Sequence, residues 1–134
     1  MNAEKLEEAV ALAAAVGAVF VATADRAGVP HVACAGKIEL DQDRRVIVTE
    51  WFCPGTVANV CENEAISIVA WDATTDTGYQ LIGRLQGIEN VAVLNGYGPG
   101  LASGASMPQV ERRLTIEIER VLGFCRRPHS DLED

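Results

Sequence analysis

The 134-residue sequence has few aromatic residues, only two histidines and no long uncharged apolar run. No apolar run approaches the roughly 20 residues that a membrane-spanning helix requires, so we expect no association with a membrane. The short apolar stretch near the N-terminus follows acidic residues, where a secretory signal would carry Lys or Arg. We therefore expect a cytoplasmic protein.

Basic residues are also scarce, because 11 Lys and Arg stand against 19 Asp and Glu and give a formal net charge of −8. No basic run is longer than a pair. This balance argues against binding to nucleic acid, whose phosphates require a positive surface. It also repels anionic ligands at long range, so any phosphate site must be built locally.

The sequence contains none of the common catalytic patterns, such as GxxxxGK[ST], HExxH, GxSxG or a Rossmann fingerprint. The four cysteines include no CxxC pair, so we expect reduced thiols and no metal site. They are Cys34, Cys53, Cys61 and Cys125. His31 follows a proline in a predicted hairpin, where a structural or exposed role is favoured over a general base or a haem ligand. No catalytic residue can be assigned from these patterns.

The hydrophobic pattern predicts one leading helix and then mostly β-structure. Asn2 is a favourable N-cap for a helix that ends at Gly17. Strands are predicted over 18–24, 31–40, 46–51, 65–71, 78–94 and 112–124, with a short helix over 56–62 and an irregular surface loop over 95–108. Gly83 and Gly87 predict bends in the fifth strand. These elements predict a single domain over residues 1–134 that is mainly β, with six antiparallel strands closed into a barrel.

The order of these elements resembles the FMN-binding split-barrel family, which includes pyridoxamine-phosphate oxidases and small FMN-binding proteins. The resemblance rests on the hairpin VFVATADRAGVPHVACAGKIEL, the strand VIVTEW and the segment TVANVCENEAISIVAW, and it runs from about Gly17 to Leu122. It implies a six-stranded antiparallel split β-barrel with an N-terminal helix and a short helix between strands three and four. It also implies a homodimer with FMN at the interface.

The resemblance further implies which residues contact the flavin. They are Lys37 at a basic position, Val48, Thr49, Glu50 and Trp51 along the flavin ring, and Gly55, Thr56 and Asn59 near the phosphate. From the residues themselves, Thr56 has two interpretations, a helix N-cap or a phosphate ligand. Trp51 and Trp71 likewise either stack on a flavin or fill a core or a subunit interface.

The chain departs from the family at two points. Pro54 and Gly55 stand where the family commonly carries Arg or Lys, and the extended basic C-terminal motif of true pyridoxamine-phosphate oxidases is missing. We therefore expect an FMN-binding redox protein or small flavin-dependent oxidoreductase that is not a pyridoxamine-phosphate oxidase. The alternative is a non-catalytic dimeric module that has lost the flavin or binds another ligand, such as haem or a deazaflavin.

Overall fold

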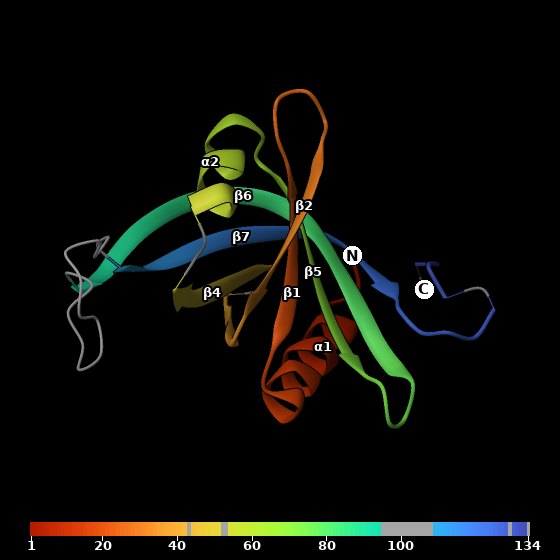
Figure 1. The fold of residues 1–134 in the computed structure, drawn as a ribbon. Coiled ribbons are helices and arrows are strands. Elements are labelled where there is room, and N and C mark those ends of the chain that lie inside the picture. Colours follow the sequence, from red (N-terminus) through yellow and green to blue (C-terminus); the bar gives the residue numbers. More distant parts are fainter. Residues whose placement is uncertain (43, 52–53, 95–108, 129, 134) are drawn as a thin grey trace.

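Two helices and seven β-strands follow the hydrophobic pattern of the chain (Figure 1). The computed structural model describes residues 1–42, 44–51, 54–94, 109–128 and 130–133, so the predicted loop over 95–108 lies outside the described residues. The elements are α1 (Ala3–Val16), β1 (Val19–Ala24), β2 (Pro30–Ala35), β3 (Lys37–Asp41), β4 (Arg45–Trp51), α2 (Pro54–Glu62), β5 (Ala65–Asp72), β6 (Thr77–Leu94) and β7 (Gln109–Gly123). Neither helix in these ranges is long and apolar enough to cross a membrane.

Helix α1 has the limits that the sequence predicts. The Asn2 side chain accepts hydrogen bonds from the backbone N–H groups of Glu4 and Lys5, at 3.0 and 3.2 Å. Gly17 ends the helix with φ 87°, a left-handed conformation that glycine adopts without strain. The buried face of α1 packs against β3, β5 and β6 and closes one side of the core.

The strand predicted over 31–40 is in fact two strands, β2 and β3, separated by Gly36. Strand β2 pairs with β1, where Ala35 lies opposite Val19, whereas β3 pairs with β4, where Lys37 lies opposite Thr49. Because the chain changes its partner strand at Gly36, one continuous apolar pattern forms two strands. The prediction of six strands is therefore wrong, and the short helix follows the fourth strand rather than the third.

The sheet is antiparallel, as predicted, but it does not close through hydrogen bonds. Its strand order is β2-β1-β5-β6-β7-β4-β3, so the two edge strands are the ones that Gly36 joins. The predicted closed barrel is wrong in this respect, because the covalent chain and not a strand ladder connects the two edges. Figure 1 shows the long, curved strands β6 and β7 spanning the molecule. Register shifts at Ile82/Gly83 and Leu85/Gly87 confirm the bends predicted at the two glycines.

The core lies between the inner face of this curved sheet and α1. On β7, Leu114, Ile116 and Ile118 are fully buried, while Thr115 and Glu117 on the other face are only half-buried. This alternation confirms the predicted half-buried strand. Burial of each such Leu or Ile side chain contributes roughly 1.5–3 kcal/mol to folding.

The C-terminal segment folds back on the turn between β5 and β6. Asp76 Oδ1 accepts hydrogen bonds from the Arg126 backbone N–H at 2.9 Å and from Trp71 Nε1 at 3.1 Å. Phe124 meets the Trp71 ring edge-on, with ring centroids 6.2 Å apart, and the Arg126 guanidinium lies 6.0 Å from the Trp71 ring centroid. Trp71 therefore lies at the end of β5 that is distant from α2. There it packs against the C-terminal segment and does not face the predicted flavin residues.

Acid is expected to loosen this C-terminal contact. The pKa of Asp76 lies below the ordinary aspartate value, chiefly because of the Arg126 backbone N–H, with further contributions from Trp71 Nε1–H and the charges of Arg126 and Arg127 that outweigh partial burial. A carboxyl with a lowered folded-state pKa stabilises the fold above its unfolded value, near 3.9, and this stabilisation is lost as the pH falls through the folded value. Trp71 emission, recorded in a Trp51→Phe background, should therefore change below about pH 4. Asp76→Asn should show the altered emission already at pH 7, and identical titrations of the two proteins would contradict this account.

Candidate functional site

The residues predicted to bind the flavin lie on β3, β4 and α2, which follow one another along the chain, and α2 itself packs against β1 and β2. Lys37, the first residue of β3, is paired with Thr49 on β4. Trp51 is the last residue of β4, and α2 begins at Pro54. The structure therefore brings Lys37 beside the second half of β4, close to the point where the chain enters α2.

The two faces of β4 divide the predicted residues. Val48 is fully buried, and its ladder partners Ile38 and Leu114 are buried too, so its side chain belongs to the core. Its backbone lies between β3 and β7 in the ladder, so Val48 offers a ligand no side-chain contact. Thr49 and Lys37 lie on the outer face, where the Lys37 side chain is 67% exposed. Glu50 and Trp51 are described by their backbone pairing, opposite Arg112 and Glu111.

Two arginines that the sequence did not assign to the site lie beside β4. Arg113 is paired with Thr49, and Arg112 is paired with Glu50. Residues that pair directly across an antiparallel ladder share a face, so Lys37, Thr49, Arg113 and Glu89 form one row across β3, β4, β7 and β6. The alternation around Leu114 predicts an exposed Arg113, but it does not reveal which strand lies beside it.

Both cations of this row are already paired with carboxylates. Lys37 Nζ lies 2.6 Å from Glu39 Oε1, and Arg113 Nη1 lies 3.9 Å from Glu89 Oε2. The Lys37 hydrogen bond and charge, with a smaller effect of Arg113, lower the pKa of Glu39 against a small opposing effect of burial. Exposed pairs of this kind contribute only about 0–1 kcal/mol, so an anionic or polar ligand can displace them.

Helix α2 begins two residues before its predicted start. Proline suits the first helical position, because its fixed φ is helical and its missing N–H needs no partner there. Thr56 therefore lies within the first turn, and the interpretation of Thr56 as the N-cap is wrong. Thr56 is fully buried, and its Oγ1 has no hydrogen-bond partner. A phosphate at this helix would first meet backbone N–H groups of the first turn.

A hairpin–helix polar cluster of Thr23, His31, Thr56 and Asn59 joins α2 to the β1–β2 hairpin, which stands beside it in Figure 1. Asn59 Nδ2 donates to Thr23 Oγ1 at 3.1 Å, and Thr23 lies opposite His31 in the ladder. The His31 ring packs on Gly55, where an added Cβ would stand 3.2 Å from Nε2. His31 Nδ1 is buried without a partner, like Thr56 Oγ1, and each such group costs about 1–3 kcal/mol. A bound water or a polar group of a ligand would satisfy these two atoms.

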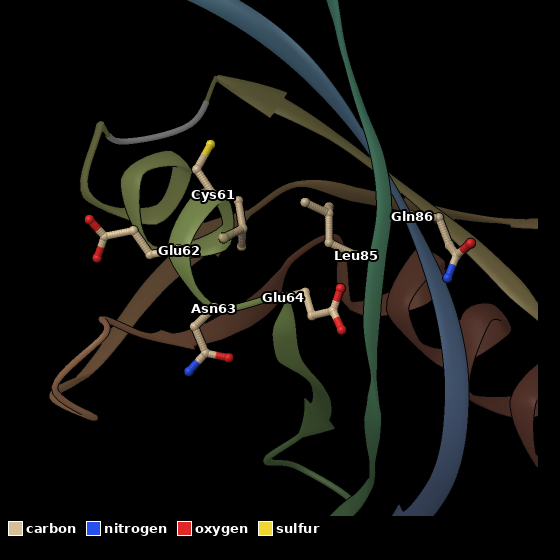
Figure 2. A pocket seen from close by; sticks show the side chains of 7 residues that line it. Cys61, Glu62, Asn63, Glu64, Leu85 and Gln86 are labelled. Atoms are coloured by element: carbon tan, nitrogen blue, oxygen red, sulfur yellow. The ribbon is translucent and has the colours of Figure 1, made fainter.

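A separate hollow of about 430 Å³ lies between the C-terminal end of α2 and β6 (Figure 2). It is lined by Val60, Cys61, Glu62, Asn63, Glu64, Leu85 and Gln86. Figure 2 shows Glu62 directed away from Leu85, while Glu64 lies toward β6, where Arg84 Nη1 is 3.0 Å from its Oε1. Its carboxylates carry the wrong charge for a phosphate, and it contains none of the predicted flavin residues. Within the described ranges, no group of His, Cys, Asp and Glu side chains is placed to hold a metal ion.

The outer face of the β1–β2 hairpin is apolar and exposed. Phe20 and Val32 are 51% and 63% exposed, and Cys34 lies opposite Phe20 while Ala22 lies opposite Val32. We call Phe20, Ala22, Val32 and Cys34 the hairpin outer face. Large contiguous apolar patches on a protein surface are typical of sites that bind a partner.

Comparison with known proteins identifies the fold. No family model and no curated protein matches the chain. Among solved structures, HupZ of Group A Streptococcus has a TM-score of 0.64 at 21% identity over 94% of this chain and 97% of its own. An FMN-binding protein from Syntrophomonas wolfei has a TM-score of 0.63 at 19% identity, over 89% and 85%. A protein of the pyridoxinephosphate oxidase family from Clostridium acetobutylicum has a TM-score of 0.62 at 18% identity, over 94% and 92%. The chain has the fold of the FMN-binding split-barrel proteins.

The split-barrel fold also occurs in proteins named for other ligands. HutZ, the heme storage protein from Vibrio cholerae, matches with a TM-score of 0.53 at 15% identity, over 93% of this chain and 98% of its own. An F420 reductase matches with a TM-score of 0.52 at 12% identity, over 78% and 87%. The ligand of a split-barrel chain must therefore be argued from its own residues.

Proposed function

We propose that this chain is an FMN-binding redox protein or small flavin-dependent oxidoreductase, which works as a homodimer with the flavin at the interface. The observation that carries the proposal is the pairing of Lys37 with Thr49 near the end of β4, the strand that precedes α2 in the chain. An FMN molecule requires polar backbone and a cation beside its ring, and a helix N-terminus for its phosphate.

The chain offers residues for both the ring and the phosphate of FMN. On β4, Glu50 and Trp51 extend past the last β3 pairing and leave a backbone edge for the ring, beside Val48 and Thr49. Among the described residues, Lys37 forms an exposed ion pair with Glu39. Gly55 carries no side chain that would keep a phosphate from the backbone, while Thr56 and Asn59 lie behind it in the hairpin–helix polar cluster. Bound FMN supplies the redox chemistry, and the chain supplies position and potential.

The hairpin outer face supports the homodimer. It exposes Phe20 and Val32 on strands that a second copy could cover, and burial of such apolar area drives association. The cytoplasm is the compartment we propose, since Cys34, Cys61 and Cys125 are free thiols.

Substitutions at Lys37 and Glu39 test the site by opposite effects. Lys37→Gln should weaken FMN and riboflavin alike by about tenfold, because it removes a charge-assisted contact to the shared ring. Glu39→Gln should raise the affinity for both flavins by up to about fivefold, because Lys37 can then contact the flavin without first breaking its ion pair with Glu39. Quenching of flavin fluorescence during titration measures each affinity. Lys5→Gln, which removes an ion-paired lysine on α1, is the matched control. Equal affinities for all four proteins would show that Lys37 is not in the flavin site.

The second candidate is a non-catalytic dimeric split-barrel module that has lost the flavin or binds haem or a deazaflavin. It is favoured by the carboxylates that already pair Lys37 and Arg113, and by the absence of Lys or Arg from the sequence of α2. Absorbance spectra recorded with FMN, haem and deazaflavin added in turn separate the candidates. A shifted spectrum with haem or a deazaflavin but not with FMN would favour the second.

A further inference from the structure

The first turn of α2 has no Lys or Arg to receive a phosphate, because it begins Pro54-Gly55-Thr56. The basic side chain that lies against this turn is His31. Three atoms of its ring, Nε2, Cδ2 and Cε1, would be 3.2, 3.6 and 3.7 Å from a Cβ on Gly55. Only glycine at position 55 lets the imidazole and the helix backbone approach this closely.

The unpartnered polar atoms of the fold gather at the same turn. Among the described residues, His31 Nδ1 and Thr56 Oγ1 are the buried side-chain nitrogen and oxygen atoms without a hydrogen-bond partner. Thr56 is completely buried and belongs to the first turn itself, and the first N–H groups of a helix have no partner within the helix. The free N–H groups and the positive end of the helix dipole favour a ligand that accepts hydrogen bonds and carries negative charge.

We propose that His31 recognises the phosphate of the bound flavin, and so replaces the basic residues that the first turn of α2 lacks. The inference rests on the proposed function and names the group that selects a phosphorylated ligand over an unphosphorylated one. A protonated imidazole donates from both ring nitrogens and adds a positive charge, whereas a neutral one donates from a single nitrogen. Histidine is the side chain that ordinarily changes charge between pH 5 and 8, so the selectivity follows pH in that range.

Few charges lie on the described elements around His31, and in the β1–β2 turn the Asp25 carboxylate accepts a hydrogen bond from the Val29 backbone N–H at 2.9 Å. Strand β1 carries no titratable residue, and α2 carries only Cys61 and Glu62, both exposed in its last turn. Cys34 on β2 lies on the opposite face from His31, and β4, which β2 also contacts, carries Arg45 and Glu50. No carboxylate of β1 or of the first two turns of α2 competes with a phosphate for the imidazole.

The test compares FMN with riboflavin, which lacks the phosphate. His31→Gln should weaken FMN by about tenfold at pH 6.5 and change riboflavin by less than about twofold. The ratio of the wild-type FMN affinity to the His31→Gln FMN affinity should be smaller at pH 8.5 than at pH 6.5. Ionisation of the FMN phosphate affects both affinities equally, so it does not change this ratio. Lys37→Gln is the control that weakens both flavins equally. Equal weakening of both flavins by His31→Gln, or a ratio independent of pH, would overturn the inference.

A second measurement uses inorganic phosphate, and thus does not depend on flavin binding. Imidazole NMR should show the His31 titration moving to higher pH when phosphate is added, while that of His129 stays in place. His129→Gln assigns the two signals. Unmoved signals would refute recognition of phosphate by His31 even where FMN binds. The proposed function fails by a different result, namely that the wild-type chain binds no flavin at all. The two failures can therefore be told apart.

Discussion

Gly83→Ala is expected to lower the free energy of unfolding by about 3 kcal/mol or more. A Cβ on Gly83 would overlap the Glu117 carbonyl oxygen and stand 2.9 Å from the Glu117 carbonyl carbon. Both are backbone atoms of β7, so relief requires moving a strand whose neighbours Ile116 and Ile118 are fully buried. Urea denaturation of the two proteins measures the difference.

Gly87→Ala is the matched control, since Gly87 lies on the same strand at the next register shift. A Cβ on Gly87 meets nothing within 4 Å, so the free energy of unfolding should stay within about 0.5 kcal/mol of the wild type. Equal stabilities of the two variants would mean that β6 and β7 do not approach each other as described at the first bend.

Phe20→Asp is expected to convert the proposed homodimer to a monomer at about 10 µM and to reduce FMN affinity at least about tenfold. The substitution places a carboxylate in the middle of the hairpin outer face, where pairing with a second copy would bury it without a counter-charge. Flavin binding should fall together with dimerisation because the proposed site is completed by the partner. Sedimentation velocity and FMN titration of the same samples measure both effects.

Leu132→Asp is the control for Phe20→Asp. Leu132 is similarly exposed, at 57% against 51%, but lies in the C-terminal segment and not on the hairpin. It should leave both the dimer and the flavin affinity unchanged. If Phe20→Asp leaves a dimer that binds FMN normally, the interface lies on another face of the sheet.

Local features of the fold could be predicted from the sequence because neighbouring residues determine them. The Asn2 cap and the stop at Gly17 depend on residues within a few positions, and the glycines themselves mark the bends at positions 83 and 87. The strand count could not be predicted at Gly36, because the apolar pattern of 31–40 continues while the hydrogen-bonding partner changes from β1 to β4. Periodicity reports which face is buried and not which strand lies alongside.

The same limit explains what the sequence missed at the candidate site. Lys37 and Thr49 came from a resemblance in chain order, but Arg113 joins them only through the pairing of β4 with β7. The burial of Thr56 and the position of His31 against Gly55 depend on how the hairpin packs on α2, which no local pattern encodes. Cys53 and the segment 95–108 lie outside the described residues, so their predicted roles stay predictions.

A native mass spectrum of the protein, purified without added cofactor and then mixed with excess FMN, tests the central claim most directly. The account predicts a dimer that carries two FMN molecules, with Phe20→Asp giving a monomer that carries none. A wild-type monomer, or a dimer that takes up no FMN even in excess, would contradict a flavin site at the interface of two copies of this chain.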